Sequence, residues 1–555
     1  MTTMKKADNL TFALAQIDTS VGAIDANKQK VCDYAAQARE RGARVVVFPE
    51  MTITGYPIED LAFRATFRRR AEHAALELAE ELVSQGLGDI YVVIGTVGTL
   101  TSGTAADDDR PTNRLLVLHE GHILSTYDKQ FLPNYGVFDE FRIFTPGHDT
   151  LVMNIDGYRV GFAICEDIWQ DDGPAIQLAQ SRLDVLVTIN GSPFEENKDH
   201  TRTDLCIQRA GEVHAPVMYV NQVGGQDDLV FDGGSFVINE KGELLARLNR
   251  FDEDLRIWTL HADGSSCTDD MAPEMSTDEM VYRACVLGLR DYMRKNGFNG
   301  VVLGMSGGID SALVATMAAD ACGGENVWGI SMPSMYSSDG SKDDAAQLAE
   351  NLGAHYEVQP IEPIFKGYQA QLQLQGIAEE NLQARIRGVI VMAYSNSHGL
   401  LTLATGNKSE CACGYSTIYG DAVGGYAPIK DVLKTRVWQL SRWRNAYAES
   451  QGELPPIPEN SIIKPPSAEL RPGQKDSDSL PQYELLDAVL EAYIEKAHGR
   501  EDLLADGFDE KTVDTVMRLV DRAEWKRRQY PLGPKVTALA FGRDRRLPVT
   551  NAFRE

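Results

Sequence analysis

The chain has 555 residues, of which 43% are hydrophobic, so it is long enough to bury sizeable cores in more than one domain. Its formal net charge of -27 opposes binding of the chain as a whole to nucleic acid or to an anionic membrane. The 8 cysteines show no disulfide or zinc spacing, and no apolar run approaches the roughly 18 residues of a membrane span. We therefore expect a reduced, cytoplasmic protein.

The first part of the chain alternates between strand and helix patterns. Leu10, Phe12 and Leu14 alternate with smaller or polar residues, 27–42 is helix-like, and 44–48 reads as a buried strand. Such alternation predicts a layered α/β fold. Further strands are predicted at 91–95, 114–118, 123–127, 158–164, 184–190 and 216–220.

Reactive side chains follow several of these strands. Glu50 comes just after the first buried strand, Lys129 after 123–127 and Cys165 after 158–164. A carboxylate can take the proton of a thiol, and a lysine can lower the thiol pKa and stabilise an oxyanion. Each residue alone is more often structural. Because strand ends gather at one edge of a sheet, we expect the three side chains to meet there.

The sequence segments around these residues resemble those of a known family. Val47-Phe-Pro-Glu50, the segment 127–140 and Ile164-Cys-Glu-Asp167 resemble the three signatures of the nitrilase superfamily, which are Glu-Lys-Cys amidases with a four-layer αββα sandwich. The resemblance covers residues 10 to about 262. It implies Glu50 as general base, Lys129 as oxyanion stabiliser and Cys165 as nucleophile, with Glu140 supporting the site. It also implies a glutamine substrate that contacts Tyr135, Ser192 and Lys198.

A change of pattern marks the second part of the chain. Residues 263–275 lack periodicity and are rich in Gly, Ser, Asp and Pro, which predicts a linker between a domain at 1–262 and another at 276–555. Ser276 and Glu279 read as a capping box that opens a helix. Strands interleaved with helical stretches then predict a doubly wound α/β domain; these strands are expected at 301–304, 327–331, 355–359 and 400–405.

The first of these strands runs into Ser306-Gly-Gly-Ile-Asp-Ser311, which is followed by a helix. A glycine pair at a strand-to-helix turn lets backbone N–H groups converge on an anion, and the helix N-terminus adds positive charge. A Walker A loop would carry lysine and Ser/Thr here, whereas this loop carries Asp310. A carboxylate beside phosphate predicts Mg²⁺ between them.

This spacing resembles the ATP-pyrophosphatase superfamily, which splits ATP into AMP and pyrophosphate. Together with the segments 380–387, 405–410, 414–421 and 428–431, it makes residues 276–555 similar to NAD synthetases. The resemblance implies that deamido-NAD⁺ contacts Asn381, Glu410 and Lys526, and that Asp310 and Glu410 hold Mg²⁺. It implies an ATP site formed by Gly304, Met305, Ser306, Gly307, Gly308, Ile309, Asp310, Ser311 and Thr405.

Three further features suggest hypotheses. Arg385 and Arg387 offer guanidinium forks for phosphate or carboxylate. The proline-rich segment 455–481 is expected to be a connector or a lid, and we favour a lid. A basic cluster between Lys526 and Arg546 predicts a contact with the pyrophosphate of a dinucleotide.

The two halves together resemble the glutamine-dependent NAD⁺ synthetase family. The resemblance implies that one half releases ammonia from glutamine, while the other adenylates deamido-NAD⁺ with ATP and lets ammonia displace AMP. The alternatives are another glutamine-dependent ligase with the same ATP loop, or a nucleotide sensor with an inactive amidase. Intact Glu50, Lys129 and Cys165 argue against the sensor. We expect small-molecule substrates, no nucleic-acid or membrane partner, and a homo-oligomer.

Overall fold

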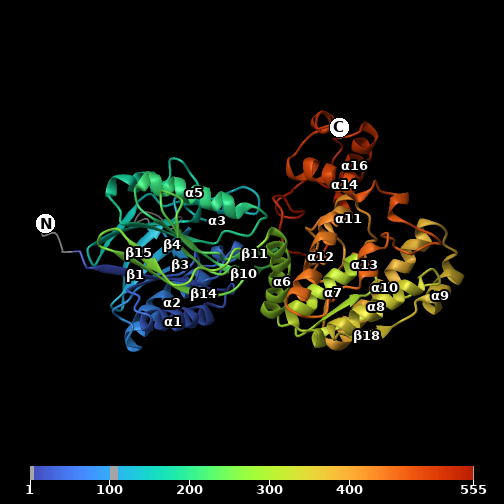
Figure 1. Ribbon diagram of the computed structural model, residues 1–555, viewed down its shortest axis with the longest axis horizontal. Coiled ribbons are helices and arrows are strands. Elements are labelled where there is room, and N and C mark those ends of the chain that lie inside the picture. The colour runs from blue at the N-terminus through green and yellow to red at the C-terminus, as the bar shows by residue number, and fades with distance from the viewer. Residues whose placement is uncertain (1–5, 101–109, 554–555) are drawn as a thin grey trace. The chain divides into compact units, whose positions relative to one another are not determined.

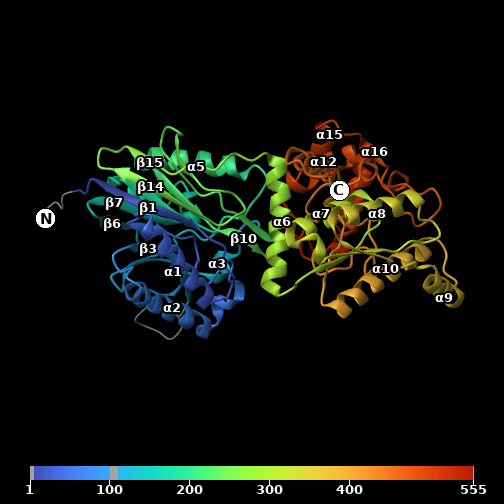
Figure 2. The same cartoon turned by 60° about the horizontal axis from the view of Figure 1, so that its bottom comes forward.

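The computed structural model describes residues 6–100 and 110–553. The chain divides into two compact units, and Figures 1 and 2 show the elements of each. The first unit contains the chain up to residue 226 together with 230–274. The second contains 275–555 together with 227–229.

The first unit contains two large sheets. One has seven strands in the order β15-β14-β1-β2-β3-β4-β5, in which β1, β2 and β3 are parallel and the remaining neighbours are antiparallel. Its strands are β1 (Asn9–Gln16), β2 (Val45–Val47), β3 (Tyr91–Thr99), β4 (Pro111–His119), β5 (His122–Asp128), β14 (Asp254–His261) and β15 (Ser266–Thr268).

The other large sheet has six strands in the order β13-β12-β9-β8-β7-β6, with β7, β8 and β9 parallel at its centre. Its strands are β6 (Leu151–Ile155), β7 (Tyr158–Ile164), β8 (Val185–Asn190), β9 (Val217–Asn221), β12 (Phe236–Ile238) and β13 (Leu244–Arg247). The short strands β10 (Val223–Gln226) and β11 (Leu229–Asp232) form a separate pair.

The two large sheets face each other across one apolar core, to which the first contributes Phe12 and Trp258 and the second Phe162 and Met218. In Figure 1, α1 and α2 lie on one side of the strands and α5 on the other. This is the expected αββα sandwich. Its helical elements are α1 (Ile24–Glu40), η1 (Glu59–Phe63), α2 (Ala65–Ser84), α3 (Glu140–Ile143), η2 (Cys165–Ile168), α4 (Pro174–Leu178), η3 (Ala179–Ser181) and α5 (Lys198–Val213).

The strand directions gather several loop starts at one edge. In each sheet the parallel strands end at the same side, and β4, which runs antiparallel to its neighbours, begins there. Glu50, Lys129, Cys165 and Gly191 follow β2, β5, β7 and β8 respectively. The first residues of β4 therefore lie beside the residues that follow these strands.

The expected linker at 263–275 is not wholly irregular. Within it, β15 pairs with β14 and completes the edge of the seven-stranded sheet. The sequence did not indicate this strand because three residues are too few to show an alternating pattern.

The second unit contains a four-stranded parallel sheet in the order β18-β17-β16-β19. Its strands are β16 (Val301–Gly304), β17 (Val327–Ser331), β18 (His355–Val358) and β19 (Leu401–Thr402), so the last is shorter than predicted. The order reverses between β16 and β19. In doubly wound sheets, ligands bind outside the carboxyl ends of the strands at this switch point. The doubly wound fold is as expected.

Helices surround this sheet, and Figure 2 shows α9 beside α10. The first helix begins as predicted, but only half of the capping box forms: Ser276 Oγ accepts a hydrogen bond from the backbone N–H of Glu279. The helical elements are α6 (Thr277–Asn296), α7 (Ile309–Cys322), η4 (Gly324–Asn326), α8 (Asp339–Leu352), α9 (Glu362–Leu372), α10 (Ile377–His398), α11 (Lys408–Cys413), α12 (Lys434–Ser450), α13 (Glu459–Ile463), η5 (Asp476–Asp478), α14 (Tyr483–Leu490), the π-helical turn η6 (Glu491–Glu495), α15 (Arg500–Ala505), α16 (Glu510–Arg522) and α17 (Glu524–Arg527).

The proline-rich segment 455–481 is an ordered part of this unit. It contains α13 and η5, and Ser461 Oγ donates a hydrogen bond to the carbonyl oxygen of Gly307 in the glycine loop. Lys464 forms an ion pair with Asp344 on α8. The segment therefore packs against the loop that the sequence marks as an ATP site. Within the described ranges 6–100 and 110–553, no helix has the length and hydropathy needed to cross a membrane.

Candidate catalytic sites

In the first unit, Lys129 joins two buried carboxylates. Its Nζ lies 2.8 Å from Glu50 Oε1 and 2.8 Å from Glu140 Oε2, and all three side chains are buried. Burial lowers the pKa of the Lys129 ammonium, but Glu140 and Glu50 raise it well above its ordinary value. The lysine therefore stays charged and holds both carboxylates in place.

Cys165 is the first residue of η2 and has a backbone φ of 43°, in the left-handed region that costs a non-glycine residue about 1–3 kcal/mol. Burial and Glu50 raise the pKa of its thiol well above the usual value, although Lys129 lowers it. Lys129 thus lowers the thiol pKa as expected, but burial and the carboxylates outweigh this one ammonium. The resting thiol is protonated and needs a base.

Glu140 opens α3 and accepts a hydrogen bond of 2.8 Å from the hydroxyl of Tyr56. Burial raises the pKa of Glu140 to about 7, against the lowering by Lys129, and Glu50 adds to the rise. Two carboxylates thus share one ammonium, and Glu140 takes up a proton near neutral pH.

Asp167 ties the Cys165 turn to the loop after Lys129. Its carboxylate accepts hydrogen bonds from the Tyr127 hydroxyl at 2.6 Å and from the backbone N–H groups of Phe131 and Ile164 at 2.9 and 3.0 Å. Burial raises its pKa to about 6, although these donors lower it. The contacts fix the nucleophile relative to the lysine.

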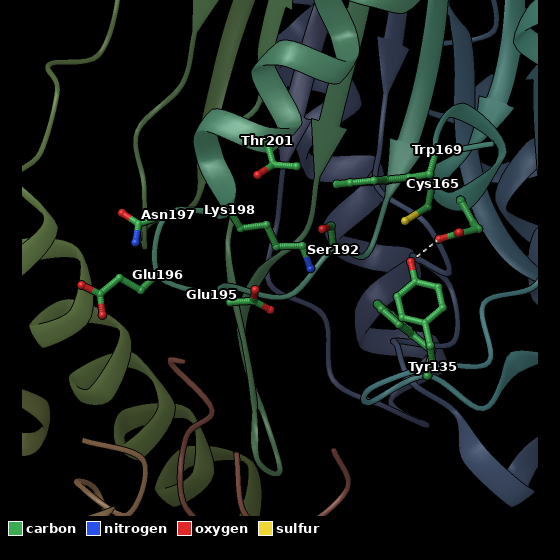
Figure 3. Close-up of a pocket in the computed structure, with 11 residues that line it drawn as sticks. Tyr135, Cys165, Trp169, Ser192, Glu195, Glu196, Asn197, Lys198 and Thr201 are labelled. Atoms are coloured by element: carbon green, nitrogen blue, oxygen red, sulfur yellow. Dashed lines mark hydrogen bonds between the residues drawn. The ribbon is translucent and has the colours of Figure 1, made fainter. Parts of the chain in front are cut away.

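The residues expected to contact glutamine line one cavity of about 400 Å³ together with Cys165. Figure 3 shows Tyr135, Ser192 and Lys198 around the hollow that holds the Cys165 thiol. The Tyr135 hydroxyl donates to Glu166 Oε2 at 2.9 Å. The remaining lining residues are Phe138, Glu166, Trp169, Glu195, Glu196, Asn197 and Thr201.

A buried ion pair holds the Ser192 loop. Arg202 and Asp232 lie 2.8 Å apart and are almost fully buried, and Arg202 Nη2 donates to the carbonyl oxygens of Ser192 and Pro193. Breaking a buried pair leaves an uncompensated charge, so this arrangement is rigid. The cavity wall opposite Cys165 is therefore preformed.

We predict that the rate of Cys165 alkylation by iodoacetamide rises with pH throughout the range 6 to 9, because the raised pKa leaves little thiolate near neutrality. Peptide mass spectrometry across this range measures it. The exposed Cys267 serves as reference in the same sample. A plateau of the Cys165 rate between pH 6 and 8 would show a resting thiolate and contradict the prediction.

In the second unit, the glycine loop joins β16 to α7. Gly307 has a φ of 77°, and a Cβ there would lie 2.1 Å from the carbonyl oxygen of Ser341, so only glycine fits. Ser306 and Ser311 lie side by side, with their hydroxyls 3.0 Å apart, and Gly308 N–H donates to Ser306 Oγ at 3.2 Å. The loop lies at the N-terminus of a 14-residue helix.

Asp310 and Glu410 lie on either side of the switch point. Asn407 links them: its Nδ2 donates to Asp310 Oδ1 at 2.9 Å, and its side chain and backbone cap α11 with Glu410. Lys434 forms an ion pair with Asp310. Burial and Asp310 raise the pKa of Glu410 well above its ordinary range, whereas Lys434 lowers it. The raised pKa means that a proton on Glu410 relieves the repulsion when no cation is bound, and the oxygens of the two carboxylates are ligands that would suit Mg²⁺.

The other residues expected to bind substrate gather around the turn at 414–417. Lys526 Nζ donates to the carbonyl oxygens of Gly414 and Ser416, both at 2.7 Å, and Thr417 Oγ1 donates to Asn381 Oδ1 at 2.7 Å. Burial lowers the pKa of Lys526. Thr405 follows β19 beside the glycine loop.

Several cations of the basic cluster also have partners within the fold, and a contact of the cluster with a pyrophosphate stays a prediction. Arg527 is buried and donates to the carbonyl oxygens of Ala412 and Val520. Lys535 pairs with Asp544, and Arg545 lies over the ring of Phe541. Arg527 thus links α17 to α11 and α16, whereas the other two contacts lie within the C-terminal segment.

The arginines of α10 each have a contact within the fold, and their binding of phosphate or carboxylate stays a prediction. Arg385 donates to the carbonyl oxygen of Ile418, and Arg387 donates to that of Met332 at the end of β17. Burial lowers the pKa of Arg387 to about 10. Each guanidinium thus has a structural contact in addition to any ligand.

Sequence reasoning assigned no role to Tyr56, Asn113, Asp167 or Lys434. Asp167 lies within the motif 164–167, two residues after Cys165, so its position in the sequence could have indicated a role at the site. Tyr56 and Asn113 lie in unremarkable segments and reach the site only through the fold.

Two family models match the chain. The carbon-nitrogen hydrolase family matches residues 11–266, and the NAD synthase family matches residues 281–530. The two matches fall on the two units that carry the sites described above.

Curated relatives match almost the entire chain. A glutamine-dependent NAD⁺ synthetase of Acinetobacter baylyi is 42% identical over 98% of this chain and 98% of its own. One of Aquifex aeolicus is 41% identical over 98% of this chain and 100% of its own. Among solved structures, a glutamine-dependent NAD⁺ synthetase of Acinetobacter baumannii in complex with ADP has a TM-score of 0.77 and 41% identity, and covers 98% of this chain and 99% of its own.

Proposed function

The chain belongs to the glutamine-dependent NAD⁺ synthetase family, and from that premise we propose which residues carry its two reactions. In the first reaction glutamine is hydrolysed to glutamate and ammonia. In the second, ATP adenylates deamido-NAD⁺, and ammonia then forms NAD⁺ with release of AMP and pyrophosphate.

Cys165 is the nucleophile of the first reaction. Glu50 accepts the thiol proton while the sulfur attacks the amide carbon of glutamine, and Lys129 stabilises the negative charge that develops on the carbonyl oxygen. The proton passes from Glu50 to the leaving nitrogen, so that ammonia departs and a glutamyl thioester remains. Glu50 then takes a proton from a water molecule, whose oxygen attacks the thioester carbon. The C–S bond breaks, glutamate leaves, and the Cys165 sulfur takes the proton back from Glu50.

The observation that carries this assignment is the buried Glu50–Lys129–Glu140 array next to Cys165. The protonated thiol requires a base, and Glu50 is the carboxylate with the greater effect on its pKa. Tyr135, Ser192 and Lys198 line the cavity in which glutamine binds.

The glycine loop and Thr405 bind ATP in the second reaction. The N-terminus of α7 and the backbone of 304–311 face the switch point where phosphates bind in such sheets. Asp310 and Glu410 hold Mg²⁺, which when bound neutralises phosphate charge. Asn381, Glu410 and Lys526 contact deamido-NAD⁺, supported by their common position around 414–417.

The remaining assignments have simpler support. We place the two domains at 1–262 and 276–555 and the enzyme in the cytoplasm, where its free cysteines stay reduced. Its partners are small-molecule substrates, without nucleic acid or membrane. A homo-oligomer stays a prediction, and light scattering after size exclusion measures the state.

We predict that Cys165→Ala abolishes NAD⁺ formation from glutamine but leaves formation from added ammonium salts, because only the first reaction needs the thiol. NAD⁺ formation is measured with each nitrogen donor. Cys206→Ala, which removes a buried thiol from α5 outside the cavity, is the matched control and keeps both activities. Persisting glutamine hydrolysis in Cys165→Ala would refute the nucleophile.

We predict that Asp310→Asn lowers ammonia-dependent NAD⁺ synthesis about a hundredfold or more, because the substitution removes one of the charges that hold Mg²⁺. Glutamine hydrolysis should continue in this variant. Asp514→Asn, on the exposed side of α16, is the control and should change neither activity. If the unmodified protein produced ADP and phosphate instead of AMP and pyrophosphate, the assignment of the glycine loop as this ATP site would be overturned.

A further inference from the structure

Asn113 is a buried amide at the start of β4 that contacts both members of the proposed Glu50–Lys129 pair. The side-chain Nδ2 of Asn113 donates to Glu50 Oε1 at 2.6 Å. Its backbone carbonyl oxygen accepts a hydrogen bond of 2.8 Å from the backbone N–H of Lys129. It is fully buried, and its Oδ1 has no partner among the residues that the structure describes. One residue therefore sets the positions of the base and the lysine.

Because Oδ1 has no partner, the contribution of the amide lies in its Nδ2 donor, which contacts Glu50. A buried carbonyl oxygen without a hydrogen bond destabilises the fold, so an apolar side chain of similar size would be the better structural choice. Turning the amide over would place Oδ1 against Glu50 Oε1, where two oxygens repel each other. The only orientation that suits Glu50 is the one that leaves Oδ1 unsatisfied.

The two carboxylates that share Lys129 differ in their other donors. Glu50 accepts hydrogen bonds from the amides of Asn113 and Gly191, the latter at 2.7 Å on Oε2. Glu140 accepts one from the hydroxyl of Tyr56. Donors that point at a carboxylate favour its ionised form. The site therefore distinguishes two acids of the same type through the groups around them.

We propose that Asn113 is the positioning residue that keeps Glu50 ionised, so that the proton shared within this site resides on Glu140 and Glu50 remains available as the base. The proposal rests on the proposed function of Glu50 and Cys165. Asn113, which lies outside the sequence motifs, thereby decides which of the two carboxylates carries the proton.

The charged and titratable groups facing Glu50 all enter this balance. Lys129 from the end of β5 pairs with Glu50 at 2.8 Å, and Glu140 from α3 shares the same ammonium at 2.8 Å. The Cys165 thiol and the Tyr56 hydroxyl face the same space, and Glu166 acts on the thiol. Both tyrosine and thiol are neutral near pH 7 because burial raises each pKa, so the two carboxylates and the lysine decide where the proton lies.

The test is the pH profile of kcat/KM for glutamine hydrolysis, whose acid limb reports the ionisation of the base in the free enzyme. Asn113→Leu keeps the volume and removes the donor. A hydrogen bond to an ionised group changes the protonation equilibrium of that group about tenfold to a hundredfold. The acid limb should therefore move to higher pH by about one to two units. A lower kcat/KM with an unmoved acid limb would indicate a merely structural role and overturn the proposal.

Tyr56→Phe is the matched control, since it removes the donor of the other carboxylate. It should push the proton further onto Glu140 and leave the acid limb unmoved or lower. An upward shift equal to that of Asn113→Leu would refute the proposal, because both variants would then act by general loosening.

Ammonia-dependent NAD⁺ synthesis by the same chain reports whether each variant is folded. If Asn113→Leu loses that activity as well, Asn113→Asp replaces it, since the carboxylate has the same shape and should raise the acid limb at least as far. An unmoved acid limb in folded Asn113→Asp would refute the proposal. If Cys165→Ala kept glutamine hydrolysis, the proposed function itself would fail. Failure of the Asn113 proposal can thus be told apart from failure of the proposed function.

Discussion

The first catalytic unit depends on one ammonium group shared by two buried carboxylates. Lys129 lies 2.8 Å from both Glu50 and Glu140, and without it two negative charges would face each other in a space that excludes water. Removing one member of a buried ion pair is strongly destabilising because the remaining charge is uncompensated. The same lysine lowers the pKa of the Cys165 thiol, although burial and Glu50 prevail.

The two units solve a similar electrostatic problem in different ways. Each places two carboxylates around one lysine: Glu50 and Glu140 around Lys129, and Asp310 and Glu410 near Lys434. In the first site the excess negative charge is relieved by a proton, since the pKa of Glu140 rises to about 7. In the second the pKa of Glu410 is raised as well, and the two carboxylates lie beside the glycine loop, where their oxygens would suit a divalent cation. The two sites thus differ in what surrounds the carboxylates more than in their balance of charges.

Much of the fold could be predicted because its strands carry strong local patterns. The buried runs 158–164, 301–304 and 327–331 became strands with the expected bounds, and the alternation of strands and helices predicted both α/β folds. β15 was missed because it is short and polar, and its pairing with β14 supplies what its own sequence lacks. The internal partners of the basic cluster near the C-terminus were missed for a related reason, since a group such as the carbonyl oxygen of Ala412 is brought to Arg527 only by folding.

The sequence by itself determined the types of chemistry: a thiol, an acid and a lysine after buried strands, and a glycine loop with Asp310 where a Walker lysine would stand. These signals are local, because a motif keeps its residues close along the chain. Only the tertiary structure decided which groups surround them. Asn113 reaches Glu50 across 63 positions and Gly191 reaches it across 141, because β2 and β8 end, and β4 begins, at one edge of the fold. Protonation depends on distances in space and on burial, so the thiol pKa and the choice between Glu50 and Glu140 could not be read from the order of residues.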